Sequence, residues 1–141
     1  MSSYALCRLE IARLRPTERV DAAHAGRIAE EMRREGMLRR PLLVERHTLA
    51  ILDGHHRFHA AQALGLRFIS AVLIAYDDPR LTLASWTERS FTREEVLMAG
   101  RSGVLLPAKS TRHILTPPLP ESPVPLAELA LADLTPSASG R

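Results

Sequence analysis

The chain has 141 residues, of which 45% are hydrophobic and 25% charged, and this composition is typical of a single globular domain. The net charge of +3 comes almost entirely from arginine, because Lys109 is the only lysine; so small an excess suits anionic ligands and does not by itself indicate DNA. No apolar run is long enough to cross a bilayer and the N-terminus lacks a secretion-signal pattern, so we expect a cytoplasmic protein. The single cysteine, Cys7, excludes an internal disulfide and is interpreted as a small buried hydrophobe.

The first third of the chain predicts a strand, a loop and a helix. Residues 4–14 partly alternate apolar and polar side chains, as a strand does, and Pro16 ends this pattern and places Glu18 in a loop. Residues 21–35 have the spacing of an amphipathic helix, whose arginines form a solvated face paired with neighbouring glutamates. Gly36 is the expected stop of this helix.

A strand-to-helix junction follows. The apolar residues of 42–52 predict a β-hairpin with its turn at 45–48, and the second strand ends at Asp53. After Gly54 the apolar residues take helical spacing as far as Leu64. The sequence therefore predicts a strand that enters a helix through Asp-Gly.

This junction concentrates polar chemistry in residues 53–57. Asp53, Gly54, His55, His56 and Arg57 bring a carboxylate, two imidazoles and a guanidinium to a helix N-terminus, where unpaired N–H groups and the helix dipole favour an anion. Phosphate is the simplest ligand. Two alternatives stay open: a merely polar helix start, and a zinc site on His55 and His59, for which no third ligand is evident.

The second half continues the mixture of strands and helices. Residues 68–76 are almost continuously apolar, which is typical of a strand buried on both faces, and residues 81–86 predict a short extended piece. Residues 92–95 form a capping-box sequence, which predicts a helix stopped by Gly100 or Gly103. We therefore expect a compact α+β domain with a small mixed sheet flanked by helices.

A second polar cluster, Lys109, Ser110, Thr111, Arg112 and His113, is predicted in a loop after that helix. These residue types bind carboxylate or phosphate, although a basic loop is as often only solvated.

The chain becomes proline-rich from residue 116, and residues 126–134 have a short helix-like pattern. We expect a domain over residues 1–115 and a tail over residues 116–141 that is extended over the domain or partly disordered.

Three motifs together resemble those of the free-serine kinases in the ParB/sulfiredoxin-like superfamily. They are Pro-Thr-Glu at 16–18, Asp-Gly-His-His-Arg at 53–57 and Lys-Ser-Thr-Arg-His at 109–113, in the same order as in that family. Trp86 resembles the family's substrate-pocket tryptophan. The resemblance spans residues 6–115 and implies a ParB/sulfiredoxin-like domain.

The resemblance implies that a phosphoryl group passes from ATP or ADP, with Mg²⁺, to the hydroxyl of free L-serine, giving O-phospho-L-serine. Glu18 would be the general base and Asp53 the second essential carboxylate, with Asp53 also a candidate Mg²⁺ contact. Phosphate contacts would come from Gly54, His55, His56, Arg57 and Lys109. The acceptor would be bound by Trp86, Ser110, Thr111, Arg112 and His113.

Other functions of the same fold remain as alternatives. A ParB-type DNA-binding module has Gly-Glu-Arg-Arg at the junction where this chain has Gly-His-His-Arg, and no helix-turn-helix pattern follows, so a nucleic-acid partner is not favoured. A sulfiredoxin-type reductase needs a cysteine where His55 stands. A nucleotide-binding regulatory relative without kinase activity is a third alternative. We expect a nucleotide and L-serine as binding partners and no association with a membrane. The sequence leaves the oligomeric state open, and a dimer is one alternative. The family's insertion after the tryptophan is missing, which leaves the nucleotide donor open.

Overall fold

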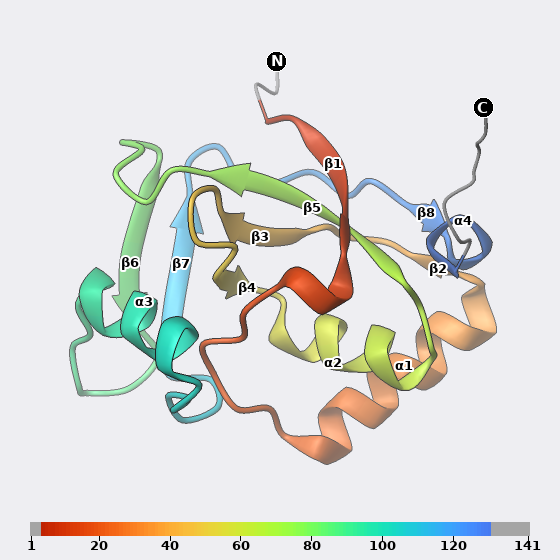
Figure 1. Ribbon diagram of the computed structural model, residues 1–141, viewed down its shortest axis with the longest axis horizontal. Helices are drawn as coiled ribbons and strands as arrows, with labels where there is room; N and C mark the ends of the chain where they lie inside the picture. Colours follow the sequence, from red (N-terminus) through yellow and green to blue (C-terminus); the bar gives the residue numbers. More distant parts are fainter. Residues whose placement is uncertain (1–3, 131–141) are drawn as a thin grey trace.

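A four-stranded mixed sheet forms the centre of the protein, seen in the computed structural model that describes residues 4–130 (Figure 1). Its strands lie in the order β1-β5-β3-β4. β1 pairs antiparallel with β5, β5 runs parallel to β3, and β3 forms an antiparallel hairpin with β4. The strands are β1 (Leu6–Glu10), β3 (Leu42–Glu45), β4 (Ile51–Asp53) and β5 (Phe68–Ile74).

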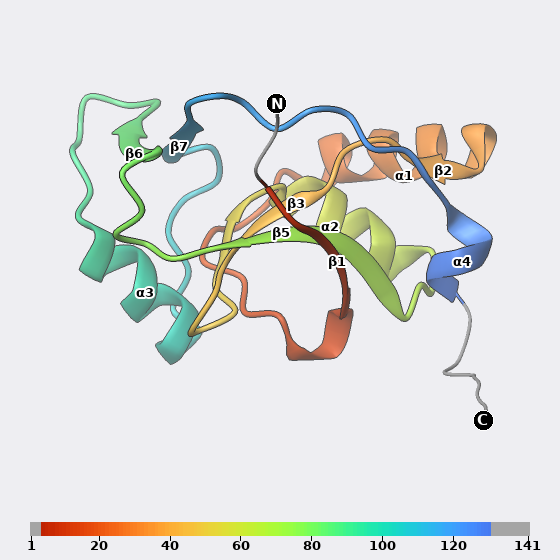
Figure 2. The ribbon, with the colours of Figure 1, turned by 90° about the horizontal axis from the view of Figure 1, so that it is seen from above.

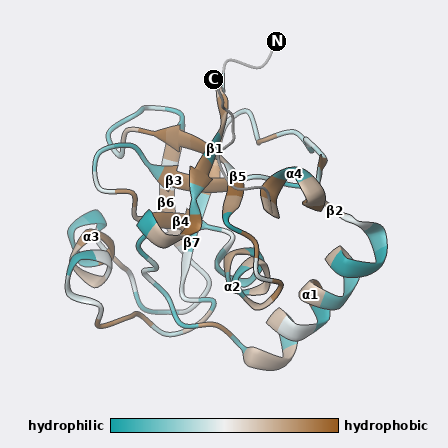
Figure 3. Ribbon diagram, turned by 45° about the vertical axis from the view of Figure 1, so that its right-hand side comes forward, coloured by the Kyte–Doolittle hydropathy of each residue, from teal (hydrophilic) through white to brown (hydrophobic). Residues whose placement is uncertain are grey.

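Both faces of this sheet are covered. The helices α1 (Ala22–Glu35) and α2 (His55–Ala63) pack on one face, and a second layer made of β6 (Leu81–Ser85), β7 (Thr111–Leu115) and α3 (Arg93–Ser102) covers the other. Alternate residues of β3, and of β5 from Ala71 to Ile74, consequently belong to two different hydrophobic clusters. Figure 3 shows hydrophobic residues, in brown, along the central strands and many hydrophilic residues, in teal, along α1. The burial of β5 on both faces confirms the prediction made from its apolar run.

The helix ends follow from the capping residues in the sequence. The Asp21 side chain accepts hydrogen bonds from the first turn of α1, and Gly36 ends the helix at φ 71°, in the left-handed region that glycine tolerates. Thr92 and Glu95 form the predicted capping box of α3, which runs on to Gly103. No helix within residues 4–130 has the length and apolar character needed to cross a membrane.

Two predicted elements differ from the structure. The first strand ends at Glu10 and is followed by a 3-10 turn, η1 (Ile11–Arg13), so it is shorter than the predicted 4–14. Residues 111–113, which were predicted in a loop, belong to β7 and pair with β6, because the partner strand offers a complete antiparallel ladder that the polar sequence does not reveal. Cys7 lies on β1 and is half-buried, with its thiol 3.3 Å from the Ala71 carbonyl oxygen.

The segment after β7 crosses the domain to the side opposite β6 and β7, next to β2 and α1 (Figure 2). There, β8 (Val124–Pro125) pairs with β2 (Met37–Leu38), and α4 (Leu126–Ala130) follows. Leu129 of α4 is completely buried in the main hydrophobic cluster. Residues 116–130 thus run over the domain, and the predicted helix-like residues 131–134 lie outside the described part of the chain. The predicted boundary at residue 115 stays a prediction.

Candidate active site

The N-terminus of α2 is held unusually close to the sheet. Gly54 joins β4 to α2 at φ 104°, a conformation that L side chains rarely adopt. A Cβ atom there would lie 2.4 Å from Cδ2 of the fully buried Leu42 and 2.8 Å from Nη2 of Arg57. Only glycine fits this junction. In an α-helix the first-turn N–H groups have no intrahelical partner, and they favour an anion.

His55, the first residue of α2, is buried and faces the loop that carries Glu18. Its Nε2 atom accepts hydrogen bonds from the backbone N–H groups of Thr17 (3.0 Å) and Glu18 (3.2 Å). Because both partners are donors, Nε2 must carry its lone pair and the ring proton must be on Nδ1. Burial, and then the neighbouring His113, His56 and Arg57, lower the pKa of His55 to about 3, which keeps the ring neutral.

The Glu18 carboxylate is buried and binds the loop between α3 and β7. It accepts hydrogen bonds from the backbone N–H groups of Lys109 (3.1 Å) and Thr111 (3.0 Å), and a short one from the Thr111 hydroxyl. Burial raises the pKa of Glu18, and these hydrogen bonds oppose the shift. A carboxylate has roughly four lone-pair positions, so a further donor such as a substrate hydroxyl can still be accepted.

The backbone around Glu18 is also held from the other side. Leu106 donates its N–H to the Thr17 carbonyl (2.9 Å) and accepts from the Arg19 N–H (2.8 Å). The Thr17 side chain is fully buried, and its hydroxyl donates to the Ile51 carbonyl (2.8 Å). The loop bearing Glu18 is therefore fixed by contacts to three separate segments.

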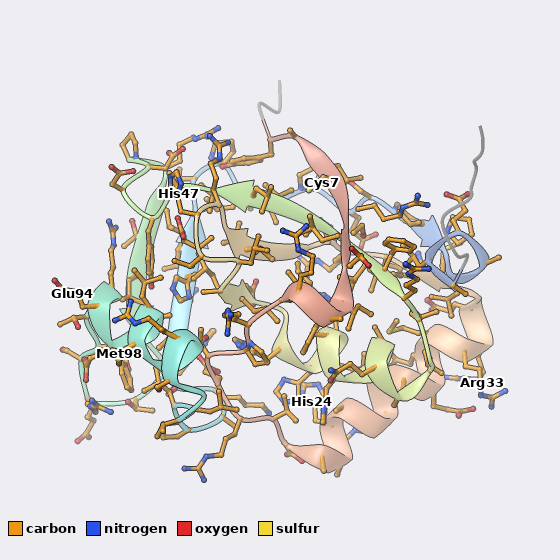
Figure 4. The ribbon with its side chains drawn as sticks, in the orientation of Figure 1. Cys7, His24, Arg33, His47, Glu94 and Met98 are labelled. Atoms are coloured by element: carbon orange, nitrogen blue, oxygen red, sulfur yellow. The ribbon has the colours of Figure 1, made fainter. Side chains whose placement is uncertain are left out.

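His56 ties the start of α2 to the start of α1. Its Nε2 accepts a hydrogen bond from the Asp21 N–H (3.0 Å), and its ring centroid lies 4.4 Å from that of His24. Burial and the neighbouring His24 lower the pKa of His56. Figure 4 shows His24 on α1 where that helix passes α2. Nδ1 of His24 is buried without a hydrogen-bond partner among the described residues.

Arg57 and Asp53 form the charged part of the junction. Arg57 donates from Nη2 to the Pro41 carbonyl (3.1 Å), while its buried Nε has no partner within residues 4–130. Burial lowers the pKa of Arg57, and the nearby Asp53 carboxylate opposes that shift. Asp53 itself is exposed, so its carboxylate is available to a ligand.

These groups line one cavity of about 280 Å³. Most of the predicted site residues meet there, namely Glu18, Asp53, Gly54, His55, His56, Arg57, Trp86, Lys109 and Thr111. The sequence did not point to three others in the wall, His24, Ile28 and Leu52. His24 lies on a helix face that looked merely amphipathic, and no sequence signal distinguished it.

Three predicted site residues lie elsewhere. Ser110 is buried; its hydroxyl donates to the Pro107 carbonyl (2.6 Å) and its backbone carbonyl accepts from the Trp86 N–H (3.0 Å), so it shapes the loop and does not line the cavity. Arg112 and His113 line a neighbouring cavity of about 210 Å³, which shares Asp53 and Arg57 with the first.

Arg112 and His113 are each held by an aromatic side chain. The Arg112 guanidinium stacks over the exposed Trp86 ring at 4.4 Å. Nε2 of His113 is hydrogen-bonded to the Tyr76 hydroxyl at 2.7 Å. Burial lowers the pKa of His113 to about 4, and the nearby Arg93 adds to the shift. His113 is therefore a neutral wall residue near neutral pH.

The zinc alternative finds no support in the geometry. Among residues 4–130, no group of three or more histidine, cysteine or acidic side chains is arranged to hold a metal ion. Nε2 of His55 is already engaged by the loop at residues 17–18.

Comparison with known proteins defines the class first by its fold. A free serine kinase mutant in complex with AMP superposes with a TM-score of 0.82 at 15% identity, covering 91% of this chain and 95% of that one. A conserved hypothetical protein from Pyrococcus furiosus superposes with a TM-score of 0.80 at 16% identity, covering 91% and 97%. The chain therefore has the fold seen in free serine kinase structures.

The family follows from the sequence match. Residues 3–89 match the ParB N-terminal domain, and the chain belongs to that family. A ParB-like protein from Sulfolobus acidocaldarius is 34% identical over 86 residues, which is 61% of this chain and 43% of that protein. An ATP-dependent L-serine kinase from Staphylothermus marinus is 28% identical over 82 residues, 55% of this chain and 32% of that one. The chain thus covers less than half the length of these curated relatives.

Proposed function

We propose that this domain transfers a phosphoryl group from an adenine nucleotide to the hydroxyl of free L-serine, giving O-phospho-L-serine. One observation carries the proposal: the Glu18 carboxylate and the N-terminus of α2 open onto the same cavity. An anion-binding helix start beside a buried carboxylate supplies the two things that phosphoryl transfer needs, a phosphate cradle and an orienting base. The names of the serine-kinase relatives support the same reaction.

The nucleotide phosphates would lie against the first turn of α2. The first-turn N–H groups of α2 have no partner within the helix, and Arg57 adds a guanidinium whose Nε has no protein partner within residues 4–130. Mg²⁺ fits beside this turn, because it is commonly held by one or two carboxylates together with phosphate oxygens, and Asp53 is an exposed carboxylate on the cavity. When bound, Mg²⁺ would neutralise phosphate charge.

Glu18 would orient the acceptor. As the serine oxygen bonds to the transferred phosphorus, the bond from that phosphorus to the nucleotide's bridging oxygen breaks, and the hydroxyl proton passes to Glu18. The raised pKa of Glu18 suits this role, because a buried carboxylate holds a proton more readily than an exposed one. Trp86, on the same cavity, would face the amino acid, and the Lys109 ammonium would contact the phosphates.

One observation favours a second candidate, a nucleotide-binding regulatory module without kinase activity. Glu18 already accepts three hydrogen bonds from Lys109 and Thr111, as a purely structural clamp on that loop would. In this alternative the nucleotide would bind at α2 and the loop would report its presence.

Phosphorus NMR separates the two candidates. The purified protein is incubated with Mg²⁺ and L-serine, with ATP or ADP in separate tubes and with matched tubes that lack serine. We expect a phosphoserine signal that depends on serine, in the tube with the true donor. Nucleotide binding without phosphoserine in either tube would favour the regulatory module.

Two variants test the base. Glu18→Gln should abolish turnover while nucleotide affinity stays within about fivefold, because the phosphate cradle is unchanged. Glu31→Gln, on the exposed face of α1, is the matched control and should keep full activity. An active Glu18→Gln protein would remove the assignment of Glu18 as base.

A further inference from the structure

His55 stands between the two halves of the proposed site. Its backbone belongs to the first turn of α2, where the phosphates would bind, and its ring reaches the peptide that precedes the Glu18 side chain. The pattern of histidines at this junction suggested a phosphate ligand. The contacts in the structure indicate a different task for the ring.

We infer that His55 is a positioning residue whose neutral imidazole holds the Thr17 and Glu18 peptide groups, so that the Glu18 carboxylate stays aligned with the phosphate-binding turn of α2. The catalytic consequence of this inference rests on the proposed function, whereas the hydrogen bonds to Nε2 of His55 are independent of it. In this role the ring acts through the loop at residues 17–18 and not directly on the substrate or the phosphates.

The donors around Nε2 decide the charge of the ring. The N–H groups of Thr17 and Glu18 both point to Nε2 of His55. The Thr17 hydroxyl oxygen lies 3.2 Å from Nε2, but its proton is donated to the Ile51 carbonyl. A proton on Nε2 would face two N–H donors at hydrogen-bond distance, which is repulsive. The ring is consequently neutral and gives the phosphates no positive charge.

Losing this acceptor would leave two buried donors without a partner. Thr17 is fully buried and Glu18 nearly so, so water does not readily replace the imidazole. The Leu106 N–H would still donate to the Thr17 carbonyl, and the Leu106 carbonyl would still accept from the Arg19 N–H, so the loop would stay in place. The loop would therefore shift at Glu18 without detaching, and a small shift at a catalytic group lowers turnover strongly.

Two amides of different length test this directly. In His55→Gln the side-chain oxygen reaches the position of Nε2 and can accept the same two N–H groups. In His55→Asn the amide reaches only as far as Nδ1 and cannot. We expect His55→Gln to keep kcat within about threefold, and His55→Asn to lower kcat by about a hundredfold with nucleotide affinity changed less than about fivefold.

A phosphate contact by the ring gives a different pattern. If the imidazole bound phosphate as a cation, both variants would lose nucleotide affinity together and His55→Gln would not rescue turnover. Equal loss of nucleotide affinity in both variants would overturn the inference.

Nitrogen-15 NMR of the wild-type ring provides a readout independent of variants and of kinase activity. We expect a neutral His55 ring between pH 5 and 8, with the proton on Nδ1 and an unprotonated Nε2. A ring that titrates in that range, or that carries its proton on Nε2, would overturn the inference even if both variants failed to fold.

The failure of the proposed function can be recognised separately. If the wild type makes no phosphoserine, hydrogen exchange at the Thr17 and Glu18 N–H groups still tests whether the His55 ring holds these two peptide groups. Slow exchange in wild type and His55→Gln with fast exchange in His55→Asn would support it, and equal exchange in all three would refute it.

Discussion

Thr111→Val tests the charged hydrogen bond at the centre of the site. The substitution keeps the shape of the side chain and removes the hydroxyl that donates to the buried Glu18 carboxylate, while the two backbone donors remain. A hydrogen bond to a charged group contributes about 1.5–3 kcal/mol, so we expect the free energy of unfolding to fall by that amount at pH 8.

The sign of the pH dependence follows from the pKa of Glu18. Burial raises this pKa in the folded state, so the folded protein holds the proton more tightly than the unfolded chain. The stability that Glu18 contributes is therefore fully present below its ordinary pKa and is lost as pH rises through the raised one. Removing the Thr111 donor raises the pKa of Glu18 further, so the loss caused by Thr111→Val should be large at pH 8 and smaller at pH 4.

Urea denaturation of wild type and variant at the two pH values measures this difference. Ser110→Ala is the matched control, because its hydroxyl donates to an uncharged carbonyl in the same loop. That control should cost about 0.5–1.5 kcal/mol at both pH values. A Thr111→Val loss that is the same at pH 4 and pH 8 would refute the assigned charge interaction.

Three further outcomes are expected. Gly54→Ala should destabilise the fold and abolish nucleotide binding in calorimetry, because its Cβ would meet the buried Leu42; normal affinity would show that the junction tolerates a side chain. Leu129→Ala should lower the free energy of unfolding by about 2–5 kcal/mol, as for other fully buried leucines; an unchanged denaturation midpoint would place α4 outside the core. Trp86 is the single tryptophan and stacks with Arg112, so serine or nucleotide binding should change its fluorescence; a signal unaltered at saturation would remove it from the site.

The elements that the sequence predicts well are those with local signals. The capping residues of α1 and α3, the buried β5 and the Asp-Gly junction each follow from the chemistry of a few neighbouring residues. The junction also led to most of the cavity wall, because its polar residues stand close together in the sequence.

The rest depends on contacts between distant segments. β7 is polar enough to be taken for a loop, and only its ladder with β6 makes it a strand. The role of the His55 ring depends on the loop at residues 17–18, and the position of His113 depends on Tyr76. Ser110 stood within a ligand-like motif, yet its hydroxyl is used inside its own loop. No local pattern distinguishes these cases.

The Glu18 clamp joins residues that are 91 and 93 positions apart in the chain. Closing so long a loop costs more conformational entropy than forming the hairpin of β3 and β4, whose contacts are local. The cavity wall is therefore completed only when the loop at Glu18 and the loop at residues 109–111, far apart in the chain, come together. Regions held by a few long-range contacts open at lower free energy than the core. Mild heating or a low denaturant concentration should consequently abolish ligand binding at the cavity while the sheet remains folded.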